Sequence, residues 1–201
     1  GTAFCVDAPE GSDAQMQKAI WEYKHENFEE AYELLKKLRQ ERPRSSLVAY
    51  YLGITCKKLQ DYGQARPYLE DAVTLSPKIK NALPELIDVL YKKGDIDGAM
   101  KWIKVAEAQD IHPPQIAFFK GLVLLKQGKD MDAAVESFKK AKEGDPALEQ
   151  TADYYIGLAY VKADQLKKAK SVFRDIATEN PNLSLAAFAD HWIRQGPERG
   201  A

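Results

Sequence analysis

Apolar residues recur at helical spacing along almost the whole chain, and the pattern itself repeats. The stretch from Ala49 to Pro77 shows one unit: Leu52 and Gly53 lie on a first apolar stripe, and Ala65 lies on a second stripe that Pro77 closes. Apolar positions three and four residues apart predict amphipathic helices, and a proline favours the end of a helix. Each unit is therefore expected to contain two helices joined by a short turn.

A small residue in the middle of each second helix marks the period. Between these residues the spacings are 34, 34, 35 and 35 residues. The residues are Ala31, Ala65, Ala99, Ala134 and Ala169. Self-similarity at this period is typical of a solenoid of stacked helix pairs. The sequence thus predicts an all-α solenoid of five helix-turn-helix repeats.

The predicted repeats leave three flanking segments. The repeats are expected at about 12–45, 46–79, 80–113, 114–148 and 149–182. A further apolar stripe over 183–194 is expected to form a C-terminal capping helix that covers the open end of the stack, with a docking surface for a following domain as the alternative. Residues 1–11 are expected to be an N-terminal tail, and residues 195–201 a polar tail or linker.

Small residues on the first helices, such as Gly53, Gly121 and Gly157, are expected to let paired helices approach closely. Pro67 conflicts with the pattern, because it falls about six residues into a predicted helix, where proline removes a backbone hydrogen bond and clashes with the preceding turn. A bend or a late start is expected in that helix.

Composition and motifs point away from catalysis and from nucleic acid. The chain has 29 Lys and Arg against 30 Asp and Glu, so no overall field attracts it to nucleic acid. His25, His112 and His191 lack a second ligand at metal spacing, and Cys5 and Cys56 form no metal or disulfide motif. Phosphate-binding loops and nucleophile elbows are absent from the sequence. We therefore expect no enzyme activity, no cofactor and no metal, and no apolar run approaches the roughly 20 residues of a spanning helix.

The first residues carry the one indication of compartment. Small residues at Gly1 and Ala3, or at Val6 and Ala8, resemble the end of a cleaved export signal, although the charged and apolar regions of a signal are missing. This slightly favours a bacterial periplasm or envelope over the cytoplasm. A boundary within a cytosolic protein explains the same residues.

The landmarks of one unit also resemble a known family. In the last unit Tyr155, Ile156 and Gly157 are followed by Tyr160, Ala169, Phe173 and Pro181, which is similar to the pattern of the tetratricopeptide repeat. The resemblance runs from about residue 12 to residue 181. It implies a right-handed superhelix whose first helices line a concave groove, and a partner peptide or helix bound in that groove.

Carried over position by position, the resemblance implies two sets of binding residues. The groove-facing residues are Met16, Ile20, Tyr23, Tyr50, Ile54, Lys57, Asp88, Tyr91, Phe118, Leu122, Leu125, Tyr154, Leu158 and Val161. The lysines at the groove edge are Lys24, Lys58, Lys92, Lys126 and Lys162. Aromatic and aliphatic rows of this kind bind apolar side chains of a partner segment. The alternatives are packing between adjacent repeats for the apolar row, and solubility alone for the lysines.

The sequence therefore predicts a non-enzymatic scaffold that binds a protein or peptide and no nucleic acid. The Lys, Asn and Arg clamp with which related repeat proteins hold chaperone tails is missing, since Ile20, Tyr51, Ile54 and Glu85 stand at the asparagine places. The alternative function is structural. In that case the chain is an assembly arm of a longer, possibly exported envelope protein, or part of a homo-oligomer.

Overall fold

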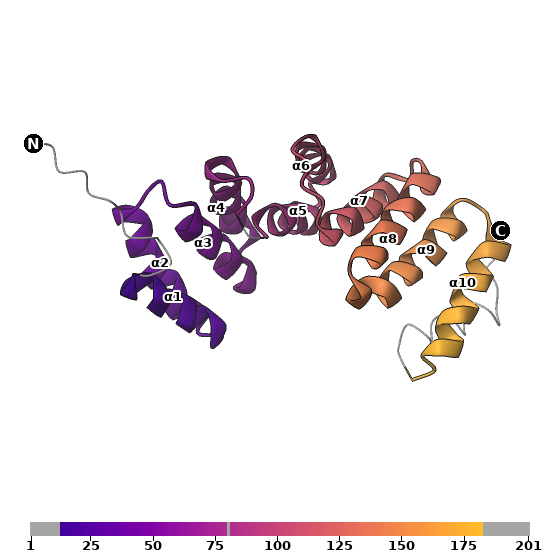
Figure 1. The fold of residues 1–201 in the computed structure, drawn as a ribbon, viewed down its shortest axis with the longest axis horizontal. Coiled ribbons are helices and arrows are strands. Elements are labelled where there is room, and N and C mark those ends of the chain that lie inside the picture. Colours follow the sequence, from indigo (N-terminus) through magenta and orange to yellow (C-terminus); the bar gives the residue numbers. More distant parts are fainter. Residues whose placement is uncertain (1–12, 80, 183–201) are drawn as a thin grey trace, which may run out of the picture. The chain divides into compact units, whose positions relative to one another are not determined.

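The computed structural model describes residues 13–79 and 81–182, and the regular structure within those ranges is entirely helical (Figure 1). The α-helices are α1 (Ala14–Lys24), α2 (Phe28–Glu41), α3 (Ser46–Lys58), α4 (Tyr62–Leu75), α5 (Ala82–Lys92), α6 (Ile96–Ala108), α7 (Pro114–Gln127), α8 (Met131–Gly144), α9 (Glu149–Lys162) and α10 (Leu166–Glu179). A short 3₁₀ helix, η1 (Pro146–Leu148), precedes α9. The all-α prediction is confirmed. The tails and the capping helix predicted over 183–194 lie outside the described residues.

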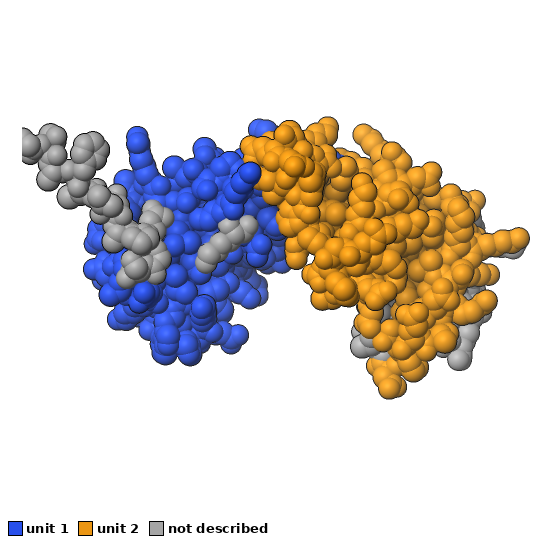
Figure 2. All heavy atoms as spheres, viewed as in Figure 1, with its two compact units in different colours: residues 1–102 blue, residues 103–201 orange. Residues whose placement is uncertain are grey.

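Each predicted repeat range contains one helix pair, from α1 and α2 in the first repeat to α9 and α10 in the fifth. The boundaries between repeats stay predictions. The chain divides into two compact units, Gly1–Trp102 and Ile103–Ala201, and α6 carries the boundary (Figure 2). Within each unit, a helix packs on its neighbours in sequence, and first helices of successive repeats also meet, as α1 meets α3 and α7 meets α9. This nearest-neighbour packing is typical of a solenoid.

The turn inside each repeat contains a residue in the left-handed region just past the first helix, and the fourth turn has a second one, Asp130, with a φ of 44°. Glu26, Gln60, Gly94, Gly128 and Asp164 follow the five first helices with φ values of 63°, 61°, 78°, 68° and 58°. A left-handed residue just past a helix lets backbone N–H groups close on the last carbonyls, as when Gln60 N–H donates to the Lys57 carbonyl at 3.0 Å. Aspartates at the next helix start, such as Asp61 on Gln64 N–H at 3.0 Å, then cap it.

Close helix contact inside a repeat depends on the glycines of the first helices. A Cβ atom added at Gly53 would lie 2.5 Å from Leu69 Cγ, and one at Gly157 would lie 2.5 Å from Phe173 Cε1. The matching distance from Gly121 to Phe138 Cε1 is 2.6 Å. The central alanines of all five second helices are 0% exposed. The large side chain of the second helix thus occupies the space that the glycine leaves free.

Pro67 does not delay its helix, so that part of the prediction is wrong. Helix α4 begins at Tyr62 with Asp61 as its N-cap and continues through Pro67 to Leu75. Pro67 is exposed, and the Gly63 carbonyl that loses its partner belongs to an exposed residue in the first turn, where it is accessible to water.

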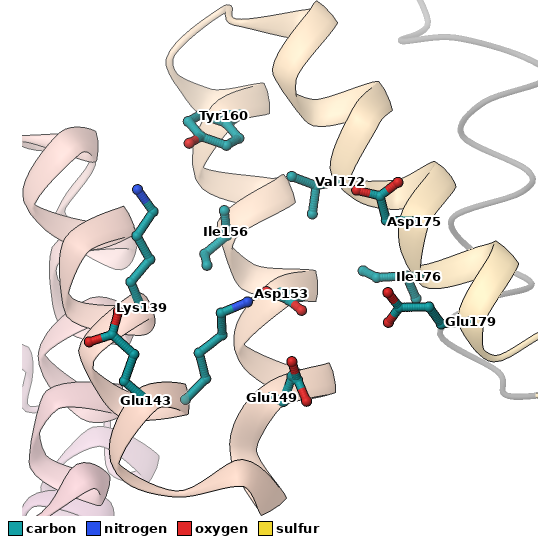
Figure 3. A pocket seen from close by; sticks show the side chains of 11 residues that line it. Lys139, Glu143, Glu149, Asp153, Ile156, Tyr160, Val172, Asp175, Ile176 and Glu179 are labelled. Atoms are coloured by element: carbon teal, nitrogen blue, oxygen red, sulfur yellow. Dashed lines mark hydrogen bonds and ion pairs between the residues drawn. The ribbon is translucent and has the colours of Figure 1, made fainter.

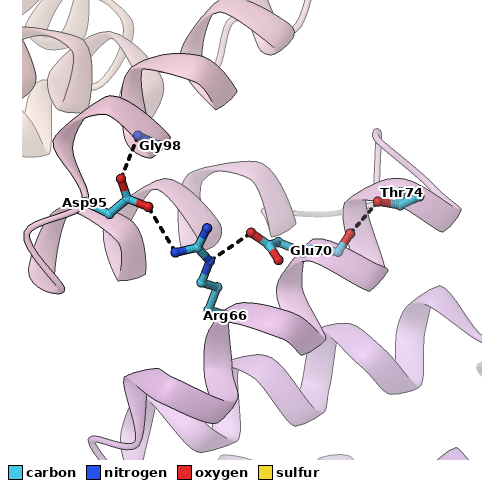
Figure 4. Close-up of polar contacts among 5 residues, drawn as sticks. All are labelled: Arg66, Glu70, Thr74, Asp95 and Gly98. Atoms are coloured by element: carbon cyan, nitrogen blue, oxygen red, sulfur yellow. Dashed lines mark hydrogen bonds and ion pairs between the residues drawn. The ribbon is translucent and has the colours of Figure 1, made fainter.

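Polar contacts join the second helix of one repeat to the next repeat in the first unit. Arg39 Nη2 lies 2.6 Å from Asp71 Oδ2, between α2 and α4. Arg66 on α4 bridges Glu70 and Asp95, with both N to O distances at 3.0 Å (Figure 4). Asp95 also accepts Gly98 N–H at 2.9 Å and so caps α6. These exposed and half-buried ion pairs fix the alignment of neighbouring repeats more than they stabilise the fold.

A Gln60→Gly variant is expected to raise the free energy of unfolding by ~0.5–1 kcal/mol. A side chain in the left-handed conformation costs ~1–2 kcal/mol, and the greater backbone entropy of unfolded glycine offsets part of that gain. Urea unfolding followed by circular dichroism measures the change. The reciprocal variant Gly94→Gln is the control and should lower stability; equal stability of both variants would contradict the turn geometry.

Gly157→Ala is expected to destabilise the protein by ~1–3 kcal/mol, because the added methyl group overpacks the Phe173 contact. Gly63→Ala is the matched control: it lies on the exposed surface of α4, where its Cβ meets only Asp61 Oδ1, at 3.4 Å. This control should stabilise by ~0.5–1 kcal/mol through helix propensity. Thermal unfolding separates the two, and a Gly157→Ala protein as stable as the wild type would refute the close contact.

Candidate partner-binding surface

In the first unit, tyrosines from two first helices form one aromatic cluster. Tyr23 on α1 meets Tyr51 on α3 edge to face with ring centroids 5.9 Å apart, and Tyr50 meets Tyr51 at 5.3 Å. Tyr23 is half-buried, whereas Tyr50 and Tyr51 are each 7% exposed. Burial raises the pKa of Tyr23 and Tyr50, and the nearby Glu85 carboxylate raises both further. These phenols therefore stay protonated at physiological pH and remain hydrogen-bond donors.

A charged network lies beside these tyrosines. Lys57 on α3 contacts two carboxylates of α5, with Nζ 2.5 Å from Glu85 Oε2 and paired also with Asp88 Oδ2. Lys92 Nζ lies 3.1 Å from the same Asp88 oxygen. Burial alone would lower the pKa of Lys57, but Glu85 and Asp88 outweigh it and the pKa is raised. Lys57 and Asp88 were both expected to face a partner, and the structure pairs them with each other.

In the second unit, aromatic rings connect α7, α8 and α9. Phe118 on α7 meets Phe138 at 5.5 Å and Tyr155 at 5.7 Å, both edge to face. Tyr154 meets Tyr155 at 5.4 Å and Phe173 at 6.2 Å. Phe118 and Tyr154 are half-buried, so each ring packs on its neighbours and keeps part of its surface exposed. Rings held in this way lose little entropy on binding a partner.

The predicted groove residues fall into two groups by burial. Met16, at 1% exposed, belongs to the core, so its assignment to a binding surface is corrected: a side chain with almost no exposed area cannot contact a partner. Tyr50, Ile54 and Leu122 are also buried, at 7%, 5% and 6%. The half-buried residues are Ile20, Tyr23, Lys57, Asp88, Tyr91, Phe118, Leu125, Tyr154, Leu158 and Val161. The buried residues support the row, and the half-buried ones offer contact area.

The five predicted edge lysines are exposed, but they differ in their contacts. Lys92 is paired with Asp88, and Lys162 Nζ donates to the Leu125 carbonyl at 2.8 Å. Across the described part of the chain, Lys24, Lys58 and Lys126 make no hydrogen bond or ion pair. Equal spacing in the sequence therefore does not give the lysines equal environments.

The remaining candidates for chemistry are a buried cysteine and two histidines that contact residues near them in sequence. Cys56 is buried, and burial raises the pKa of its thiol to about 11. His25 stacks on Trp21 with centroids 3.8 Å apart, and His112 Nε2 lies 2.8 Å from Asp110 Oδ1. Over residues 13–79 and 81–182, no three His, Cys, Asp or Glu side chains gather to hold a metal ion. No described helix is both long and apolar enough to cross a bilayer. Cys5 and His191 lie outside the described ranges.

The helix pairs that pack on their neighbours in sequence define an all-α helical repeat solenoid, a fold that serves as a scaffold for protein–protein interaction. Two tetratricopeptide repeat family models match the chain, one over residues 57–114 and one over residues 151–183. Both ranges of the chain therefore contain tetratricopeptide repeats, and proteins built from such repeats are generally non-enzymatic.

Solved structures share this fold at low sequence identity. YrrB, described as a tetratricopeptide repeat protein with an unusual peptide-binding site, has a TM-score of 0.74 and 20% identity over 88% of this chain and 90% of its own. MamA from Desulfovibrio magneticus RS-1 has a TM-score of 0.73 and 19% identity over 86% and 98%. Pseudomonas aeruginosa PilF has 0.69 and 17% over 94% and 93%. A sequence search of curated proteins found no match.

Lys57→Met is expected to lower the free energy of unfolding by ~1–3 kcal/mol, because Glu85 and Asp88 then lose their shared counter-ion in a half-buried place. The raised pKa of Lys57 means that its contribution is fully present below the ordinary lysine pKa of 10.5 and is lost as pH rises through the folded value. Urea unfolding between neutral and strongly alkaline pH measures both effects. Glu85→Gln in the Lys57→Met background should recover part of the loss, and no recovery would contradict the pairing.

Proposed function

We propose that the first helices of each unit bind an apolar segment of a partner protein. The observation that carries the proposal is the half-burial of Phe118 and Tyr154, which come from successive first helices and share Tyr155 as a neighbour. A ring that is fixed on one side and exposed on the other provides contact area at low entropy cost. Leu125, Leu158 and Val161 extend the same apolar surface on α7 and α9.

An amphipathic helix or an extended peptide suits this surface. Both kinds of ligand present apolar side chains at regular intervals, and a row of first helices repeats at regular intervals too. The peptide-binding site named for YrrB, which has the same fold, supports this choice. In the first unit the proposed contacts are Ile20, Tyr23 and Tyr91, together with the Lys57 and Asp88 network. Lys24, Lys58 and Lys126, which have no ion-pair partner among residues 13–79 and 81–182, provide cations for acidic residues of the partner, each worth ~0.2–1 kcal/mol.

An assembly role is the second candidate. Trp21 is 53% exposed and Leu75 is 43% exposed, and large apolar side chains in solvent favour contact with another chain. In this case the same fold joins copies of itself or other parts of a longer protein. Light scattering over a range of concentrations tests self-association directly. A monomer at every concentration would remove the homo-oligomer.

Site-specific photocrosslinking tests the proposed binding surface. Benzoylphenylalanine at position 118 or 154 keeps an aromatic ring in the row, so the fold is preserved while the ring becomes reactive toward a bound partner. We expect one partner from a source-cell extract to crosslink at both positions. Benzoylphenylalanine at position 75, on the exposed part of α4, is the matched control and should not capture it. Equal capture from position 75 would contradict the proposal.

A double variant with polar side chains in the apolar row tests the same surface by loss of binding. Leu125→Gln with Val161→Gln changes two half-buried side chains at the row and leaves the aromatic cluster intact. We expect the crosslinked partner to bind at least about tenfold more weakly, since two apolar contacts are lost. Circular dichroism verifies that the variant is folded. Undiminished binding would mean that the row serves packing alone.

A further inference from the structure

Three surface hollows occupy the same place in three different repeats. Their volumes are 290 Å³ in the first repeat, 510 Å³ in the fourth and 410 Å³ in the fifth. Each hollow includes the residue four positions before the small residue of the first helix: Gln15, Ala117 and Asp153. Each also includes the residues three and six positions after the central alanine of the second helix. These residues are Leu34 and Lys37, Ser137 and Lys140, and Val172 and Asp175.

The hollow of the fifth repeat has an apolar floor. Ile156 on α9 and Ile176 on α10 are each 4% exposed, and Val172 and Tyr160 are half-buried beside them (Figure 3). Ile156 and Tyr160 lie on a different stripe of α9 from Tyr154, Leu158 and Val161, because the two sets are offset along the helical period. This hollow is therefore separate from the surface proposed above.

The rim of this hollow is strongly acidic. It carries the carboxylates Glu143, Glu149, Asp153, Asp175 and Glu179 against the two ammonium groups Lys139 and Lys142. Lys142 Nζ is paired with Asp153 Oδ1 at 2.7 Å, and Lys139 Nζ with Glu136 Oε1 at 3.0 Å. Within residues 13–79 and 81–182, the other four rim carboxylates form no ion pair. They surround the apolar floor in Figure 3, drawn from α8, α9 and α10.

The acidic rim distinguishes the fifth-repeat hollow from the hollows of the first and fourth repeats. At the place of Asp175 the fourth repeat has Lys140, and the first repeat has Lys37. In the fourth repeat the floor is formed by Pro113, Pro114 and Ala117, and Lys120 and Glu107 neutralise each other at 2.5 Å. The helix pairing is the same in each case, so the differences lie in the side chains that line each hollow.

We propose that the fifth-repeat hollow binds a basic segment of a partner protein, with an aliphatic side chain on the floor and Lys or Arg side chains on the rim. Charge complementarity favours a basic segment as the occupant, because four carboxylates without an ion-pair partner in the described part of the chain lie around an apolar surface. The apolar floor adds contact that a purely electrostatic surface lacks. Long basic side chains suit this arrangement, since their methylene stems cover apolar surface while their charged ends reach a rim.

Fluorescence anisotropy with defined peptides tests this inference. The probe is a labelled peptide with the sequence Lys-Arg-Leu-Lys-Arg-Leu-Lys-Arg, and its comparators replace every Leu by Ser or every basic residue by Glu. We expect the full protein to bind the basic and apolar peptide, the Ser peptide at least about tenfold more weakly, and the Glu peptide still less. Equal binding of the Ser peptide or of the Glu peptide would overturn the proposal.

Charge reversal at the rim locates the binding site. Asp175→Lys installs the residue type that the first and fourth repeats have at the same place, so we expect the fold to tolerate it. Affinity for the basic peptide should fall at least about tenfold. Glu33→Lys on α2 is the matched control, because it makes the same change in net charge at an exposed position, and it should stay within about twofold of the wild type. Equal losses in both variants would show attraction to overall charge and overturn the proposal.

Two further measurements keep the test decisive. If Asp175→Lys proves unfolded by circular dichroism, Asp175→Asn with Glu179→Gln removes two carboxylates at nearly constant shape and should give the same loss. Light scattering without peptide tests whether a second copy of this chain occupies the hollow instead. Self-association of the wild type that Asp175→Lys abolishes would assign the hollow to another copy of this chain and overturn the proposal of a basic partner. The result is independent of crosslinking at positions 118 and 154, so each proposal can fail alone.

Discussion

The contact between a glycine on the first helix and a large side chain on the second is the constraint on which the second, fourth and fifth repeats depend. At Gly157 a single added methyl group would lie 2.5 Å from Phe173, a side chain that is itself 0% exposed. Gly53 with Leu69 and Gly121 with Phe138 repeat this arrangement. Because the contact fixes how far apart two helices lie, it also fixes which stripe of each helix remains for neighbouring repeats and for partners.

This constraint explains why the fold could be predicted from the sequence. Glycine and alanine at a constant interval can be recognised in the sequence alone. Gly157 and Ala169, for example, predict the helix pair that the structure contains as α9 and α10. The position of the turn was equally accessible, since capping residues such as Asp61 occupy it. The start of α4 could not be predicted in the same way. Pro67 suggested a bend or a late start, but the helix continues through Pro67 because this residue is exposed and lies near the helix start.

The candidate site was harder to predict, because exposure depends on how each helix is rotated against its neighbours. Met16 occupies a family position that implies contact with a ligand, yet it is 1% exposed. Lys57 has the right side chain for a partner carboxylate, but Glu85 and Asp88 of the next first helix take that role. The contacts of Lys57 depend on residues 28 and 31 positions further along the chain, and no local pattern encodes such a pairing. Burial and ion pairing emerge only when adjacent repeats are in place.

The same constraint leaves other positions free to vary, and the residues of the proposed fifth-repeat binding site are among them. Asp153 and Asp175 take no part in the contact between Gly157 and Phe173, so substitutions at these places change the surface without disturbing the helix pair. Lys140 at the place equivalent to Asp175 shows that opposite charges occupy one scaffold position in different repeats. Helix α9 thus carries an aromatic stripe through Tyr154 and a separate stripe beside an acidic rim through Ile156. A fold held by a few small residues can present two chemically different surfaces from one helix, and the two binding surfaces proposed here depend on that separation.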